Sequence, residues 1–144
     1  MSVRALVVAL LMLASAGVSA SAGEAETPAP GTPLRAALLA AVRPVVEAEV
    51  GGTVEFQVYE LRVVGEWAFA SLRPQRKGGA PIEWTYTRYQ RFVDDGAFDE
   101  VVTALLRQTP NGWLIFGYDL GATDVVWTPW KDDFPVPPEV FPGG

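Results

Sequence analysis

Cysteine and histidine are both absent from this chain of 144 residues. Without a thiol or an imidazole, the protein has no route to Cys-His or Ser-His-Asp catalysis. The common zinc sites, which need histidine or cysteine ligands, are excluded for the same reason, and disulfides cannot form. The stability of the fold therefore has to come from packing, for which a hydrophobic content of 49% and five tryptophans provide the material.

Positive charge is also scarce. The chain has 11 basic and 17 acidic residues, and its net charge of −6 disfavours nucleic acid and anionic membrane surfaces as partners. Basic residues cluster only at Arg73, Arg76 and Lys77. A carboxylate-only calcium or magnesium site remains open to such a chain. The acidic residues at 94–100 do not follow the spacing of an EF-hand loop, and turn chemistry explains them better, so we predict no metal site. We also predict no cofactor.

The apolar run at residues 5–16 is too short to span a membrane. It has 12 residues, whereas a span needs about 20. The run follows Arg4 and precedes a string of small residues, which is the pattern of a secretory signal peptide over residues 1–22. Cleavage after Ala20 or Ala22 predicts a periplasmic or secreted protein with no membrane span in the mature chain.

The mature chain begins with a polar, proline-rich stretch at 23–33, which predicts a disordered lead-in. Residues 34–50 then carry apolar side chains three and four positions apart, as in an amphipathic helix. We predict Thr32 as the N-cap of this helix and Gly51 as the residue that ends it. Pro44 is expected to kink the helix or to restart it as a second segment.

A first hairpin follows the helix. Apolar and polar residues alternate from Val54 onward, and the parity of the alternation changes near Tyr59 and Glu60. One extra residue in a strand has this effect, so we predict a β-bulge there. The pair Gly65-Glu66 predicts a tight turn into a return strand at 67–73.

A second hairpin is predicted further along the chain. Its strands cover residues 98–108 and 113–120, and Asn111-Gly112 forms the turn between them. The segment 82–93 has features of both helix and strand, and we favour a short helix.

These elements predict an α+β fold, in which the N-terminal helix packs on a curved four-stranded antiparallel sheet made of two long hairpins. Residues 34–144 have the size of a single domain. The domain ends in a proline-rich tail at 131–144, which is expected to pack as irregular coil.

This order of elements resembles the cystatin-like and ketosteroid-isomerase-like α+β group, in which a curved antiparallel sheet wraps around a helix. The stretches LRVVGEWAFA (61–70), PQR (74–76) and GATDVVW (121–127) are also similar to those of an uncharacterised family of small exported bacterial proteins. The resemblance implies a fold and a cellular location. It implies no activity, and no functional residue is carried over from it.

Three residues near the last strand are candidates for acid–base catalysis. Asp119 and Asp124 bracket a glycine-containing break after that strand, and Tyr118 adjoins it. In a cone-shaped fold this break would lie at the mouth of a pocket. We favour a different interpretation, in which Asp124 is the N-cap of a short helix that runs to about Trp130.

Four further residues are candidates for ligand binding. Trp127 and Trp130 belong to an aromatic-rich region that could offer a platform to a sugar or a peptide, although packing in the core is the favoured interpretation. Arg73 and Arg76 lie at a loop and could hold an anionic group.

The sequence favours an exported, non-enzymatic accessory or binding domain of the bacterial cell envelope. Its partner would be a small molecule, a glycan or an envelope protein. The alternative is a small-molecule isomerase-like or hydrolase-like enzyme with a carboxylate base in a cone-shaped pocket. An apolar pocket between helix and sheet would favour the enzyme, whereas a filled core with exposed aromatic side chains would favour binding.

Overall fold

The computed structural model of the chain describes residues 23–144, so that the predicted signal peptide lies outside the described residues. The regular elements, in order, are α1 (Pro33–Val50), β1 (Glu55–Val64), β2 (Trp67–Gln75), η1 (Lys77–Gly79), α2 (Gln90–Asp94), β3 (Val102–Thr109), β4 (Gly112–Leu120), α3 (Trp130–Asp133) and η2 (Pro138–Val140). The four strands pair antiparallel in the order β1-β2-β3-β4 and leave the sheet open. The predicted α+β fold, with its N-terminal helix and two hairpins, is confirmed.

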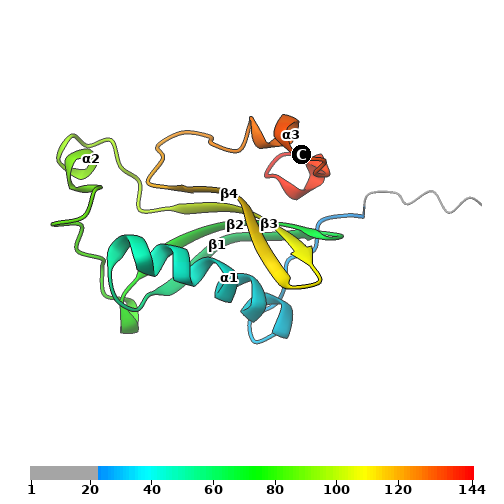
Figure 1. Cartoon of the computed structure of the whole chain (residues 1–144), viewed down its shortest axis with the longest axis horizontal. Coiled ribbons are helices and arrows are strands. Elements are labelled where there is room, and N and C mark those ends of the chain that lie inside the picture. Colours follow the sequence, from blue (N-terminus) through cyan, green and yellow to red (C-terminus); the bar gives the residue numbers. More distant parts are fainter. Residues whose placement is uncertain (1–22) are drawn as a thin grey trace, which may run out of the picture.

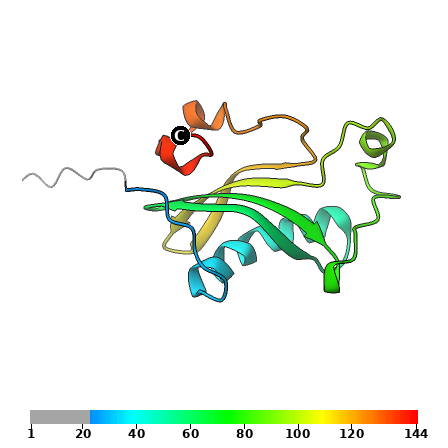
Figure 2. The same cartoon turned by 180° about the vertical axis from the view of Figure 1, so that it is seen from behind.

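The domain has three layers. Helix α1 lies on one face of the sheet, and the C-terminal segment with α3 lies on the other (Figure 1; Figure 2). Helix α2 is at one end of the sheet, in the excursion between β2 and β3 (Figure 1). We call the face toward α1 the inner face and the opposite one the outer face.

Helix α1 begins as the sequence predicts. The N-cap Thr32 accepts a hydrogen bond from the backbone N–H of Arg35 at 3.4 Å, and Pro33 takes the first helical position. The helix ends at Gly51, whose φ of 69° is unfavourable for any residue with a side chain. It does not restart at Pro44, because that residue is exposed and removes only one backbone hydrogen bond on the solvent side.

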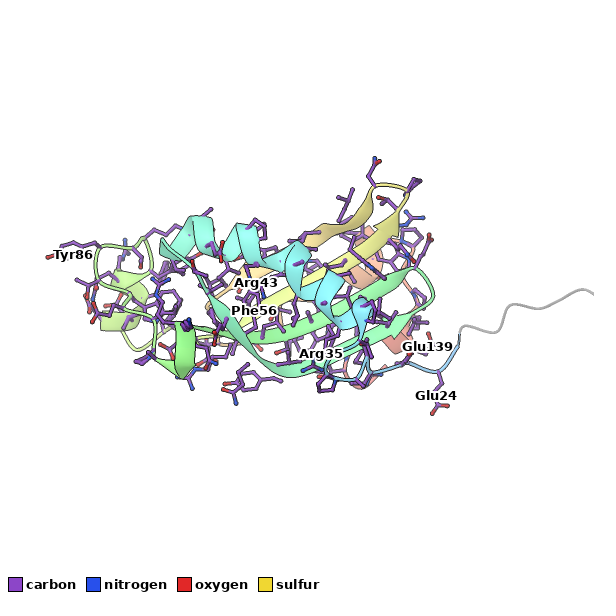
Figure 3. All side chains as sticks on the ribbon, turned by 90° about the horizontal axis from the view of Figure 1, so that it is seen from below. Glu24, Arg35, Arg43, Phe56, Tyr86 and Glu139 are labelled. Carbon is purple, nitrogen blue, oxygen red and sulfur yellow. The ribbon has the colours of Figure 1, made fainter. Side chains whose placement is uncertain are left out.

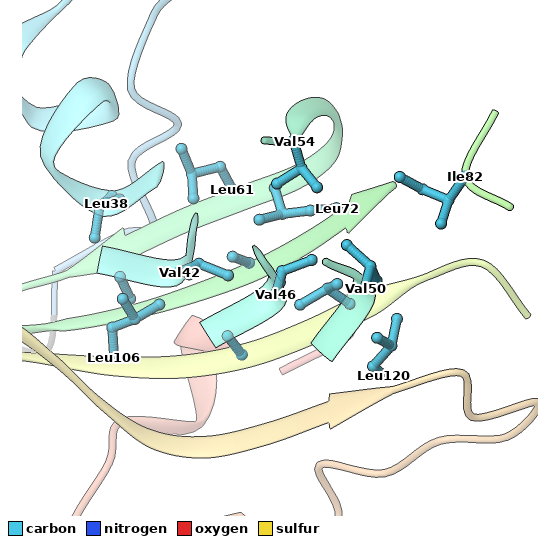
Figure 4. Packing of buried hydrophobic residues seen from close by; sticks show 14 of the residues in the cluster. Leu38, Val42, Val46, Val50, Val54, Leu61, Leu72, Ile82, Leu106 and Leu120 are labelled. Carbon is cyan, nitrogen blue, oxygen red and sulfur yellow. The ribbon is translucent and has the colours of Figure 1, made fainter. Parts of the chain in front are cut away.

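Between α1 and the sheet lies the larger part of the hydrophobic core. Every fourth residue of the helix, from Leu38 to Val50, points at the sheet (Figure 4). Val45, which lies three positions after Val42 and so fits the apolar spacing of the sequence, is 37% exposed. The inner-face residues that pack beneath the helix include Leu61, Leu72, Leu106 and Leu120 (Figure 4). These side chains touch one another directly, so the interior between helix and sheet is filled.

Strand β1 contains the predicted bulge. Its register against β2 shifts between Val58 and Glu60, which leaves Tyr59 outside the pairing. As a consequence Phe56 and Leu61 pack on the same core although an odd number of positions separates them. This prediction is confirmed.

The second hairpin is confirmed with a turn one residue earlier than expected. Residues 110–111 form the turn, and Gly112, with a φ of 99°, opens β4. A bulge that the sequence analysis did not predict follows in β4. The register shifts between Leu105 and Leu106, so that Phe116 has no partner across the ladder.

The outer face is covered by the C-terminal segment. Phe69 of β2 lies under it, with its ring centroid 5.1 Å from that of Trp127 and 5.9 Å from that of Phe141. Arg62 of β1 donates hydrogen bonds to the carbonyls of Glu139, at 2.8 Å, and Val140, at 3.2 Å. The tail is irregular for much of its length, as predicted, but α3 and η2 interrupt it, and it covers the apolar part of the outer face.

The excursion between the hairpins departs from the prediction. Helix α2 covers only the last part of the helix expected at 82–93, and β3 begins at Val102 rather than at Phe98. The ring of Phe98 packs against Trp84 and Tyr89, with centroid distances of 4.7 and 5.4 Å. Burial in this aromatic cluster outweighs the local preference for an extended strand.

The lead-in at 23–33, for which the composition predicts disorder, contacts the domain at several points. Glu26 exchanges two backbone hydrogen bonds with Val63, at 2.9 and 2.8 Å. Pro28 is buried, and its carbonyl accepts a hydrogen bond from Arg35 at 3.1 Å. The lead-in thereby covers part of the free edge of β1, which would otherwise offer unpaired backbone groups.

Docking of the C-terminal segment should be required for stability. Phe141 is fully buried, and Phe141→Ala is expected to lower the free energy of unfolding by about 3–5 kcal/mol, because it leaves a cavity against Phe69. The measurement is urea unfolding followed by tryptophan fluorescence. Tyr86→Ala is the control, because Tyr86 is fully exposed and projects from one end of the molecule (Figure 3). Equal stability of the two variants would mean that the outer layer is not docked.

Candidate functional site

A hollow of about 380 Å³ opens at the end of the sheet where the chain leaves β4. We call it the end hollow. Tyr89, Phe92 and Phe98 form an aromatic wall on one side, and the segment from Asp119 to Asp124 forms the other. Its volume lies within the range of small-molecule sites. Two of the three candidates for acid–base chemistry, Asp119 and Asp124, are thus brought to one hollow.

Gly121 fixes the shape of this hollow. A Cβ atom built on Gly121 would lie 2.2 Å from the ring of Phe98, and its φ of 99° strains any other residue. The backbone of Gly121 accepts a hydrogen bond from Asp99 and donates one to Val101, both at 3.0 Å. Glycine therefore lets the chain turn directly against the aromatic wall.

Both aspartates use a carboxylate oxygen in a local backbone hydrogen bond. Asp119 accepts from the N–H of Ala122 at 3.0 Å, and Asp124 accepts from the N–H of Val125 at 2.7 Å. Asp124 is not the N-cap of a helix, which corrects the prediction. The helix that follows is α3, and it begins only after Pro129, whose fixed φ suits the start of a helix better than the apolar residues between them.

Tyr118 does not join the two aspartates. It packs on the inner face, whereas its neighbour Asp119 points to the other side, because successive residues of a strand alternate between faces. The hydroxyl of Tyr118 lies 3.5 Å from a carboxylate oxygen of Glu49, on the last turn of α1. Tyr89 donates a hydrogen bond to the same oxygen, and Arg88 pairs with the other one.

We call Glu49, Arg88, Tyr89 and Tyr118 the phenol cluster. Burial, followed by the hydrogen bond to Glu49, raises the pKa of Tyr89 from its ordinary value near 10 to about 12. Burial and the nearby charge of Glu49 raise the pKa of Tyr118 further. Both phenols are therefore neutral hydrogen-bond donors at physiological pH. The cluster joins α1, β4 and the excursion, and only Tyr89 also lines the end hollow.

The sequence analysis missed Glu49, Arg88 and Tyr89. Arg88 and Tyr89 lie 39 and 40 positions after Glu49, and no spacing motif connects a glutamate at the end of a helix with a distant Arg-Tyr pair. The contact depends on how the excursion folds back, and local patterns do not report this.

The two candidate arginines have structural partners. Arg73 forms an ion pair with Glu100 at 2.7 Å, and that hydrogen bond raises its pKa. Glu100 also accepts a hydrogen bond from the indole of Trp84 at 2.6 Å. Arg76 donates to the carbonyls of Val50 and Thr53, at 3.2 and 3.1 Å, where α1 ends. The two side chains do not converge on one anion site.

The two candidate tryptophans belong to the outer layer. Trp130 lies so close to Gly117 that a Cβ atom there would be 2.7 Å from the indole ring. Trp127 packs edge-to-face on Phe69. Both are partly buried against the hydrophobic cluster of the outer face, which includes Phe69 and Phe141. Trp127 also borders a second hollow, described below.

Two broader properties concern residues 23–144. No helix formed by them has the length and apolarity needed to cross a membrane. Nowhere in this part of the chain do three acidic side chains gather closely enough to hold a metal ion.

Comparison of the chain with protein-family models, with curated proteins and with solved structures gives no match. The case for a function therefore depends on the geometry of the chain itself.

The phenol cluster predicts a loss of stability in alkali. Because the pKa of Tyr89 is higher in the folded state than in the unfolded state, the neutral phenol contributes to the stability of the fold. This contribution is fully present below pH 10 and is lost as the pH rises toward about 12. Each phenol contributes a slope of at most about 1.4 kcal/mol per pH unit. In urea unfolding between pH 9 and 12, Tyr89→Phe should reduce this slope, while Tyr86→Phe, outside the cluster, should leave it unchanged. Equal slopes in both variants would contradict the burial of the Tyr89 phenol.

Proposed function

We propose that this protein is an exported, non-enzymatic binding domain of the bacterial cell envelope, and that it takes a small molecule into the end hollow. Export rests on the signal-peptide pattern of residues 1–22. Binding rests on one observation, the meeting of an aromatic wall with the carboxylates of Asp119 and Asp124 in a hollow of about 380 Å³.

Three features support binding over catalysis. The space between α1 and the sheet, where a cone-shaped active site would lie, is filled by core side chains. Both aspartates of the hollow are engaged by backbone N–H groups. Tyr89 is the phenol that lines the hollow, and its hydroxyl donates a hydrogen bond to Glu49. One oxygen of each aspartate and the hydroxyl of Tyr89 therefore already take part in structural hydrogen bonds.

The lining indicates the kind of ligand. Tyr89, Phe92 and Phe98 offer apolar ring surface, and Asp119 and Asp124 offer negative charge, while the walls of the hollow include no lysine or arginine. A ligand with an apolar body and a cationic group would match both features of the lining. Its body would contact the rings, and its cation would form charge-assisted hydrogen bonds with the carboxylates. We therefore infer that the ligand is a small amine with an apolar or aromatic body.

The test uses two probes with the same body and opposite charge. In a ¹H–¹⁵N NMR titration at low salt, 2-phenylethylamine should shift the amide signals of residues 119–124 with a Kd of about 1 mM or weaker, and 3-phenylpropionate should not. Asp119→Asn and Asp124→Asn each keep a side-chain oxygen that can accept the backbone N–H hydrogen bond, and each removes a negative charge. Each variant should therefore weaken amine binding by up to about fivefold. Asp132→Asn, on α3, is the matched control.

Equal shifts from the two probes would show that charge plays no part and would overturn the amine as ligand class. No shift from either probe would overturn the end hollow as a binding site.

The second candidate function is an isomerase-like or hydrolase-like enzyme with a carboxylate base. The observation in its favour is that Asp119 and Asp124 lie beside an aromatic wall, where a bound carbon acid could meet a base.

This alternative predicts proton exchange. With 4-phenyl-2-butanone in D₂O, a carboxylate would remove an α-proton and the carbanion would take deuterium from solvent, which NMR detects as loss of the ¹H signal. Our proposal predicts no acceleration over an equal concentration of acetate. Acceleration of about tenfold or more that disappears in Asp119→Asn or Asp124→Asn, with probe binding retained, would establish the enzyme instead.

A further inference from the structure

A second hollow, of about 300 Å³, lies on the outer face of the sheet. We call it the outer hollow. The strands β2 and β3 form its floor, and the segment after β4 forms a wall, so that Asp124 borders both hollows. In Figure 1 this segment runs over the sheet from the end of β4 toward α3.

The floor of the outer hollow is polar, whereas the neighbouring part of the same sheet face is apolar. Ser71 of β2 pairs directly with Thr103 of β3, so the two hydroxyl side chains lie next to each other on the outer face. Two residues along, Phe69 pairs with Leu105, and the C-terminal segment covers that apolar pair. Thr103 is 7% exposed and is the one buried polar residue among residues 23–144. The sheet thus places hydroxyl groups where the covering layer ends.

The walls add an indole and two carboxylates. Trp127 packs edge-to-face on Phe69 of the covered region and also lines the outer hollow. Asp99 and Asp124 border the hollow from the two segments that flank β3 and β4, and Thr123 adds a third hydroxyl. The outer hollow therefore combines a flat aromatic ring with three hydroxyls and two acceptor-only groups.

We propose that the outer hollow binds the ring of a neutral sugar. A pyranose has a face of C–H groups, which packs on an indole ring, and a rim of hydroxyls that both donate and accept hydrogen bonds. The carboxylates of Asp99 and Asp124 accept sugar O–H groups in charge-assisted hydrogen bonds. Ser71, Thr103 and Thr123 exchange donors and acceptors with the remaining hydroxyls. This proposal does not depend on amine binding in the end hollow.

The same lining disfavours other ligands. Two carboxylates without a lysine or arginine in the walls repel a phosphate or an acidic sugar. A cation would be satisfied by the carboxylates alone and would leave the hydroxyls of the floor without a role.

The test is an NMR titration that follows the Trp127 indole N–H, with methyl β-D-glucopyranoside and the methyl glycoside of N-acetylglucosamine as probes. At least one glycoside should shift this signal with a Kd in the millimolar range. Glucose 6-phosphate and tetramethylammonium should leave it in place. A chain of three or more β-linked glucose or N-acetylglucosamine units that binds at least tenfold more tightly than the single ring would indicate a polysaccharide source rather than a free sugar.

Two variants connect binding to the hollow. Thr103→Val removes a hydroxyl at nearly constant volume, and Asp99→Asn removes a charge, and each should weaken glycoside binding about fivefold or more. Thr85→Val, at an exposed site outside both hollows, is the matched control. Thermal unfolding of each variant checks that the fold is retained.

The outcomes separate the two sites. Loss of glycoside binding in Thr103→Val with amine binding unchanged supports the proposal. Glycoside binding unaffected by both variants, or no response to any glycoside, would overturn it. A response to tetramethylammonium that matches or exceeds the glycosides would assign the hollow to cations instead.

Discussion

The constraint on which the structure depends is that the sheet must be buried on both faces by packing alone. The chain has no cysteine, and a domain of this size gains enough stability only if it covers most of its apolar surface. Strand β2 meets this requirement, since Trp67, Ala68, Phe69 and Ala70 are all buried although successive side chains point to opposite faces. Helix α1 covers one face, and the C-terminal segment has to cover the other.

The position of both hollows follows from this two-sided burial. The covering segment extends over the apolar pairs of the outer face and stops at Trp127, beyond which Ser71 and Thr103 make the sheet polar. The chain leaves the end of the sheet through Gly121, whose close approach to Phe98 sets the aromatic wall of the end hollow. Hollows at the limits of a filled core expose polar groups at fixed positions without opening the core.

Local patterns predicted the elements and missed the long-range contacts. The Thr32 cap, the bulge at Tyr59 and the two hairpins were correctly predicted, because each depends on the conformational preferences of a few adjacent residues. The β4 bulge at Phe116 and the start of β3 at Val102 rather than at Phe98 were missed, since tertiary packing of aromatic rings decides both. Of the candidate site, Asp119 and Asp124 were predicted.

The phenol cluster was beyond prediction for the same reason. Glu49, Tyr89 and Tyr118 come from a helix, an irregular excursion and a strand, and only the folded chain brings them together. Topology also separated Tyr118 from Asp124, although they are close in sequence, because one lies on the inner face and the other beyond the strand end. Proximity in sequence near the end of a strand is therefore a poor guide to a shared site.

The surroundings of the carboxylates bear on the choice between binding and catalysis. A general base gains most when water is excluded and when its lone pair is aimed at the reacting atom. Asp124 is exposed, and one of its oxygens is turned toward the N–H of Val125 in its own turn. This hydrogen bond holds one carboxylate oxygen in place, and a fixed acceptor is what recognition of a cation or of a hydroxyl requires. On the proposed assignment, the hydrogen bond that fixes each aspartate leaves its other carboxylate oxygen to face a ligand.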